Sequence, residues 1–110
     1  MLDPRVQLIA LSGALDLATE RRLRADVSQA AGDPSSGLVI DLRGVTFMES
    51  STLAVLVHAD QQFRRQGRML ACVVRQGPVS LLLDATGLRH QLAVFDTPEA
   101  AASHVLQTNT

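Results

Sequence analysis

Short apolar runs alternate along this chain with segments in which apolar residues recur at helical spacing. Runs of mostly apolar residues with high β-propensity are typical of strands. They predict strands at residues 5–11, 38–42, 69–74 and 92–95. Between and after these runs, an apolar residue at every third or fourth position predicts helices with one buried face. The expected helices cover residues 19–31, 53–66, 78–86 and 98–106.

Residues with special backbone preferences mark the expected boundaries. The turn-forming pair Ser12-Gly13 is expected to end the first strand, and residues 32–37 are expected to form a loop. Thr19 is expected to cap the first helix at its N-terminus, with Gly32 just beyond its C-terminus. Similar signals bound the later helices: Gly67 after the second, Pro78 and Gly87 at the two ends of the third, and Thr97-Pro98 at the start of the fourth.

Strands that alternate with helices through short connections predict an α/β fold with a mostly parallel sheet. We expect one domain over residues 1–110, with a parallel or mixed sheet of four to five strands and about four helices. Residues 38–42 fit a central strand covered on both faces. Residues 107–110 are expected to form a frayed tail.

Composition narrows the classes of function. The chain has 110 residues, 46% hydrophobic residues and a formal net charge of -1, so it has no bulk attraction for nucleic acid. Cys72 is the single cysteine, which rules out an intramolecular disulfide and predicts a buried, inert thiol in a reducing compartment. No apolar segment approaches the length of a membrane span, and the N-terminus lacks the pattern of a secretory signal. We therefore expect a cytoplasmic protein without membrane insertion.

Motifs for catalysis or metal binding are missing from the sequence. It contains no glycine-rich phosphate loop and no nucleophile elbow. Its histidines, His58, His90 and His104, fall on separate expected elements without a second ligand at metal-site spacing. We therefore expect no enzymatic activity, no metal and no cofactor.

Asp41 has two interpretations. It follows an apolar run, where functional groups of open α/β sheets gather, and a phosphoaspartate site of the response-regulator kind would place its acid there. Such a site also needs a lysine, and all ten basic residues of this chain are arginine. We therefore favour a turn-forming carboxylate before Arg43-Gly44.

The most informative segment is the polar cluster 49–52, which precedes an apolar helical stripe. In one interpretation Ser50 or Ser51 is the N-cap of the helix and has no further role. In the other, an exposed serine at a helix N-terminus is a phosphorylation switch, because unpaired N–H groups and the helix dipole favour a phosphate there. Two adjacent hydroxyls allow one serine to cap while the other is modified.

Several segments together resemble the STAS family, and within it the bacterial anti-sigma factor antagonists. Residues 11–16, Leu-Ser-Gly-Ala-Leu-Asp, resemble the family's Gly-Glu-Leu-Asp segment. Residues 39–42 and 45–48 resemble its central strand and the approach to its phosphorylation loop. Residues 49–53, Glu-Ser-Ser-Thr-Leu, are similar to the family pattern Asp-Ser-Ser/Thr-Gly-Leu, and residues 84–88 resemble a later landmark.

The resemblance implies a mechanism of partner switching. It makes Ser50 the phosphoacceptor, with Ser51 as the second choice, and places Glu49, Thr52 and Leu53 in the partner-binding loop. The unmodified protein then binds an anti-sigma factor that is also a serine kinase, which frees the sigma factor for transcription. Phosphorylation at Ser50 breaks this contact until a serine phosphatase restores it.

Two residues depart from the family motif. Glu49 replaces the usual aspartate, and Thr52 replaces the usual glycine, where a β-branched residue excludes positive φ and is expected to crowd whatever approaches the helix start. These changes keep two alternatives open: a STAS subunit of an ABC-type lipid transport complex, and a signalling scaffold that is not phosphorylated. Family members also have a further strand before residues 5–11, so we expect an exposed sheet edge at which a homodimer can form.

Overall fold

The computed structural model describes residues 3–33 and 37–107, which form one parallel sheet and its covering helices. The strands lie in the order β1-β2-β3-β4, and each pairs in parallel with its neighbour. Their bounds are Val6–Ala14 for β1, Gly37–Phe47 for β2, Met69–Val73 for β3 and Ala93–Phe95 for β4. The helices are α1 (Leu17–Gly32), α2 (Ser50–Arg65), α3 (Pro78–Thr86), the 3-10 helix η1 (Leu88–Gln91) and α4 (Pro98–Val105). The expected α/β class, strand number and helix number are confirmed.

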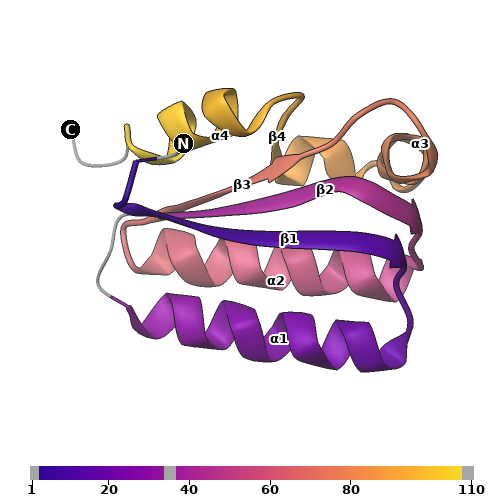
Figure 1. Ribbon diagram of the computed structural model, residues 1–110, viewed down its shortest axis with the longest axis horizontal. Coiled ribbons are helices and arrows are strands. Elements are labelled where there is room, and N and C mark those ends of the chain that lie inside the picture. Colours follow the sequence, from indigo (N-terminus) through magenta and orange to yellow (C-terminus); the bar gives the residue numbers. More distant parts are fainter. Residues whose placement is uncertain (1–2, 34–36, 108–110) are drawn as a thin grey trace.

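The sheet separates two apolar cores. Figure 1 shows α1 and α2 side by side below the sheet and α4 above it. Leu38 and Ile40 of β2 belong to the core between the sheet and the helices α1 and α2. Val39, which lies between them in the strand, packs with α4 on the other face of the sheet. Successive residues of a strand face opposite sides, so β2 is buried on both, as its unbroken apolar run predicted.

The predicted end of the first strand is wrong, because Ser12 and Gly13 lie inside β1. Ala10 lies opposite Asp41, and the next pair is Ser12 opposite Gly44, so β2 contains one more residue there. A Cβ on Gly44 would lie 3.0 Å from the Cβ of Ser12, and Gly13 has a φ of 74°. Gly44 therefore allows the two strands to approach closely at the bulge, and Gly13 adopts the positive φ that the bulged strand requires; neither forms a turn that ends the strand.

Asp41 does not form the expected turn either. It lies within β2, where one carboxylate oxygen accepts from the backbone N–H of Arg43 at 3.0 Å and the other from its guanidinium at 2.9 Å. The hydrogen bonds from Arg43 lower the pKa of Asp41. The carboxylate thus satisfies a backbone donor beside the bulge.

The first helix begins earlier than predicted, because its cap is Asp16 and not Thr19. The Asp16 carboxylate accepts from both the backbone N–H and the hydroxyl of Thr19, each at 2.9 Å. An ionised cap at a helix N-terminus is favoured by the helix dipole, and these hydrogen bonds lower the pKa of Asp16. Gly32, expected just beyond the helix, is its last residue.

The second strand is longer than predicted, since β2 covers Gly37–Phe47 and not 38–42, and α2 begins at Ser50 and not at residue 53. The signals that end α2 and bound the later helices are confirmed. Gly67 and Gly87 follow α2 and α3 with φ values of 70° and 73°, and Pro78 opens α3. Thr97 caps α4 by accepting from the N–H of Ala100 at 3.2 Å. Of the expected loop 32–37 and tail 107–110, residues 34–36 and 108–110 lie outside the described residues. Within the described ranges, none of the helices has the length and apolar composition to cross a membrane.

Arg68 joins the C-terminal end of α1 to the turn that follows α2, a contact that the sequence did not reveal. Its guanidinium donates to the carbonyl oxygens of Ala30 and Ala31 at 3.1 and 2.9 Å. It also stacks over the ring of Phe63, with 4.5 Å between the guanidinium carbon and the ring centroid. One side chain thus satisfies helix-end carbonyls and holds α1 against α2.

We predict that Arg68→Ala lowers the free energy of unfolding by about 2 kcal/mol, because it removes three charge-assisted hydrogen bonds, to Ala30, Ala31 and Gln66, and the stacking on Phe63. Urea denaturation measures the change. Arg65→Ala is the matched control, since Arg65 is an exposed arginine at the C-terminal end of α2 and its removal should cost about 0.5 kcal/mol or less. Equal losses for the two variants would contradict the structural role of Arg68.

A carboxylate, Asp60, is buried on the inner side of α2. It forms an ion pair with the Nε atom of Arg64 at 2.8 Å, but burial outweighs this attraction and raises its pKa. Burial, with a smaller contribution from Asp60, also raises the pKa of Cys72 to about 12. The expectation that Cys72 is buried is confirmed, and so high a pKa keeps the thiol protonated.

The raised pKa of Asp60 predicts a pH-dependent stability. The folded state binds this proton more tightly than the unfolded state, so stability rises as the pH falls from neutral through the folded pKa, and the gain is complete below the ordinary value of 3.8. In Asp60→Asn this contribution is absent. The difference in unfolding free energy between wild type and variant should therefore shift in favour of the wild type as the pH is lowered from neutral toward 3.8. A pH-independent difference in urea denaturation would refute the assignment.

Candidate functional site

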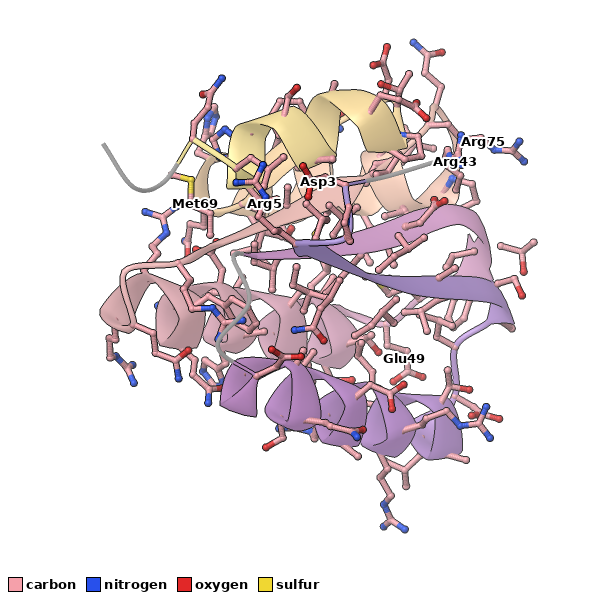
Figure 2. All side chains as sticks on the ribbon, turned by 60° about the vertical axis from the view of Figure 1, so that its left-hand side comes forward. Asp3, Arg5, Arg43, Glu49, Met69 and Arg75 are labelled. Atoms are coloured by element: carbon pink, nitrogen blue, oxygen red, sulfur yellow. The ribbon has the colours of Figure 1, made fainter. Side chains whose placement is uncertain are left out.

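Ser50 and Ser51 lie in the first turn of α2, at the edge where the parallel strands have their carboxyl ends. Both side chains are exposed. Glu49, just before the helix, lies on the same side of the molecule as the ends of β1 and β2 (Figure 2). Groups that follow the carboxyl ends of parallel strands are well placed to meet a ligand or partner.

Buried residues on both sides fix the two serines in place. Met48 precedes them and packs into the core between the sheet and the helices α1 and α2. Thr52 and Leu53 follow the serines and are also buried. Ser50 and Ser51, between these buried anchors, are both exposed. Their position is therefore set by packing before any partner binds.

Neither serine is the N-cap, so this interpretation of the sequence is wrong. Glu49 occupies the cap position with an extended backbone, and its carbonyl oxygen accepts from the N–H of Thr52 at 3.0 Å. The Glu49 side chain makes no capping bond. Ser50 and Ser51 are the first and second helical residues, and their hydroxyls make no hydrogen bond with any other residue in the described ranges.

Thr52, which departs from the family's glycine, packs inward. Its side chain is 2% exposed, and its hydroxyl donates a long hydrogen bond of 3.5 Å to a carboxylate oxygen of Glu20 on α1. The expected crowding at the helix start is therefore wrong, because the extra atoms fill the space between α1 and α2. Glu20 was missed from the sequence, where an acid in the first turn of a helix is unremarkable.

Two exposed apolar side chains lie at the same edge. Phe47 ends β2 and is 54% exposed, while Leu17 begins α1 and is 62% exposed. The backbone N–H of Leu15 donates to the carbonyl oxygen of Phe47 at 2.9 Å, so the segments that lead into α1 and α2 are adjacent. Exposed apolar groups beside polar ones are typical of protein-binding surfaces. We call this surface the docking rim: Leu17, Phe47, Glu49, Ser50 and Ser51.

The other candidate residues are not brought together. Exposed His58 and His90 lie on α2 and η1, and His104 on α4 packs against the ring of Phe95, with 5.1 Å between ring centroids. Over residues 3–33 and 37–107, no three His, Cys, Asp or Glu side chains cluster so that they could hold a metal ion. The docking rim therefore offers a modifiable hydroxyl and an apolar contact surface, and these suit recognition by a protein.

Comparison with known proteins identifies the family. Residues 2–101 match the STAS domain. The chain belongs to the STAS domain family. The family resemblance inferred from residues 11–16 and 49–53 is thereby confirmed.

Relatives of this STAS domain include regulators. RsfA of Mycobacterium tuberculosis, named an anti-sigma-F factor antagonist, is 33% identical over 98 residues, which span 87% of this chain and 77% of the relative. A solved structure of an anti-sigma factor antagonist from Mycobacterium paratuberculosis has a TM-score of 0.84 at 24% identity, covering 96% of this chain and 89% of that one.

The same fold also occurs in a different setting. A sulfate transporter family protein from Wolinella succinogenes has a TM-score of 0.77 at 15% identity, covering 98% of this chain and 93% of that one. The fold alone therefore does not separate regulation from transport, and the surface of the STAS domain must do so.

We predict that Thr52→Gly, which restores the usual residue of the family motif, destabilises this protein by about 1.5 kcal/mol. The loss combines a cavity between α1 and α2 with the poor helix propensity of glycine. Ser51→Gly is the control, because it changes the backbone alone at an exposed position and should cost about 0.5 kcal/mol. If both variants unfold at the same urea concentration, the Thr52 side chain does not support the packing of α1 on α2.

Proposed function

We propose that this STAS domain is an anti-sigma factor antagonist whose docking rim binds an anti-sigma factor with serine kinase activity. The observation that carries the proposal is the exposed Ser50 hydroxyl, which makes no hydrogen bond with another residue of the described ranges and is held between buried Met48 and Thr52. The name of RsfA supports the class of partner. In this proposal the chain is a cytoplasmic substrate of the kinase, needs no cofactor and catalyses no reaction itself.

The first turn of α2 suits a phosphoserine. Transfer of the γ-phosphoryl group of ATP to the Ser50 hydroxyl releases ADP and a proton, and places up to two negative charges at the positive end of the helix dipole. Unpaired N–H groups of this turn can then donate to the phosphate oxygens, so α2 stays folded. Hydrolysis by a serine phosphatase returns the hydroxyl and releases inorganic phosphate.

The same phosphate would change the docking rim. Phe47 and Leu17 contribute to binding only when a partner removes their exposed apolar surface from water. A doubly charged group on the same rim raises the cost of that desolvation and adds to the negative charge of Glu49. Release of the anti-sigma factor thus follows from electrostatics at the interface and needs no change of fold.

Ser50 is the favoured phosphoacceptor and Ser51 the second choice. Both hydroxyls are exposed, but Ser50 directly follows the acidic residue, as the phosphorylated serine of the family motif does. Glu49, Thr52 and Leu53 then have different roles: Glu49 meets the partner, while Thr52 and Leu53 are buried and hold the loop.

Mass spectrometry of the protein from its own host, with pull-down from the same host, tests the proposal. We predict phosphate on Ser50 and capture of a kinase-like anti-sigma factor by the wild type. Ser50→Asp should weaken the complex at least about tenfold, because it places a charge inside the interface. Ser28→Asp adds the same charge at an exposed site on α1 and should leave binding unchanged.

Other outcomes would redirect the assignment. Unmodified Ser50 and Ser51, with equal capture of transporter subunits by wild type and Ser50→Asp, would favour the transport complex. Equal capture of signalling proteins by both forms would favour a scaffold. Phe47→Ala is a second, independent test. Phe47 is exposed, so its replacement should change stability little, but it should weaken binding of the partner if the docking rim is the interface.

A further inference from the structure

One side of β1 is an open sheet edge. β1 is the first strand in the sheet order, so its other side has no neighbouring strand in the described structure, and it lies in front of β2 in Figure 1. A hollow of about 440 Å³ lies along it, lined by Gln7, Leu8, Ile9 and Ala10 of β1 and by Asp26, Gln29, Ala30 and Asp33 of α1. On this side alternate backbone N–H and C=O groups of β1 point away from β2 and meet no other strand of the described structure. At the start of the edge, the N–H of Val6 donates to the carbonyl oxygen of Asp3 at 2.9 Å.

The edge lacks the usual protection against pairing. Natural edge strands carry lysine, proline or an inward charge, but Val6–Ala14 reads Val-Gln-Leu-Ile-Ala-Leu-Ser-Gly-Ala and contains no charged residue or proline. Its first five residues, 6–10, also pair with β2 without a register shift. Residues 6–10 therefore form a regular strand segment that is able to accept another strand.

Leu8 lies at the centre of this segment and is 51% exposed. It faces the same side of the sheet as Val6, which packs with α4, yet Leu8 lies outside that apolar cluster. On the opposite face of the sheet, Ile9 packs against the core that the sheet shares with α1 and α2. Leu8 is thus an apolar side chain on a strand edge that the rest of the fold does not cover.

We propose that a second copy of this chain occupies the edge, with the two β1 strands antiparallel about a two-fold axis at Leu8. In an isologous contact of this kind, if residue i of one copy lies opposite residue j of the other, then j of the first also lies opposite i of the second. Val6 then lies opposite Ala10, Gln7 opposite Ile9, and Leu8 opposite Leu8. All of these pairs fall in the segment without bulges. Val6, Leu8 and Ala10 form the apolar pairs on one face, and Gln7 meets Ile9 on the other.

The charged residues near the edge are compatible with a second copy. Asp26 and Asp33 line the hollow beside the edge. Arg5, labelled in Figure 2, precedes β1, and its guanidinium lies 2.9 Å from Asp3 of the same chain. In the proposed register, Arg5 of one copy lies opposite Leu11 of the other, so no two like charges face each other along the paired strands.

This interface leaves the docking rim accessible. The rim lies where the strands end, whereas the edge follows the length of β1, so binding at one does not cover the other. The dimer therefore neither requires nor excludes phosphorylation at Ser50, and failure of either proposal leaves the other standing.

Sedimentation velocity at about 10–500 µM protein tests the dimer. We expect the wild type to show a monomer–dimer equilibrium. Leu8→Lys should raise the dimer dissociation constant at least about tenfold, because it sets two like charges opposite each other on an edge strand. Leu81→Lys is the matched control: Leu81 is 69% exposed on α3, and its replacement should change nothing. A monomeric wild type, or equal effects of both variants, would overturn the proposal.

Cysteine cross-linking tests the register. Cβ atoms directly opposite in an antiparallel pair lie about 5 Å apart, which a disulfide can bridge with small adjustment. Leu8→Cys should give a disulfide-linked dimer under mild oxidation, while buried Cys72 stays unreactive. Ala10→Cys is exposed on the same strand and should not cross-link, since it lies opposite Val6 of the other copy. Cross-linking through residue 10 alone would refute the two-fold at Leu8.

Discussion

The packing of α2 on the centre of the sheet is the constraint on which the rest of the structure depends. Leu53, Leu56 and Phe63 are each fully buried and lie along one face of α2, against the strands that carry Ile40 and Cys72. Full burial of such a side chain contributes about 1.5–3 kcal/mol, so this stripe fixes both the rotation and the axial position of the helix. The place where α2 begins, and with it the exposure of the serines, follows from core packing.

The bulges of β2 determine which side chains reach the docking rim. From Leu38 to Leu42, even-numbered residues face α1 and α2; after the first extra residue, the odd-numbered Val45 faces that core instead. A second extra residue restores the original phase, so that Met48 is buried and Phe47 is left exposed. The two bulges thus place an exposed side chain, Phe47, next to a buried one, Met48, just before the serines.

The sequence predicted every strand and α-helix of the described fold and the position of the serine cluster, because each has a local signal. It did not predict the role of Gly44, since whether a glycine ends a strand or permits close approach depends on the neighbouring strand. The contact of Arg68 with Ala30 spans 38 residues and that of Thr52 with Glu20 spans 32, and neither has a local pattern. Sequence reasoning therefore missed the tertiary contacts, and one of these contacts explains why Thr52 is accommodated where the family has glycine.

The STAS domain separates two kinds of surface on one small scaffold. Side chains at the carboxyl ends of the strands are exposed and are held by buried neighbours, so in the proposed switch a change of charge there leaves the core undisturbed. The open edge of β1 instead offers backbone groups and Leu8, which no modification of Ser50 alters. Since a sulfate transporter family protein shares this fold with an anti-sigma factor antagonist, the framework itself is neutral with respect to function. In the two proposals above, function depends on features that the framework tolerates: the Ser50 hydroxyl, which has no hydrogen-bond partner within residues 3–33 and 37–107, and the uncharged strand β1 at the sheet edge.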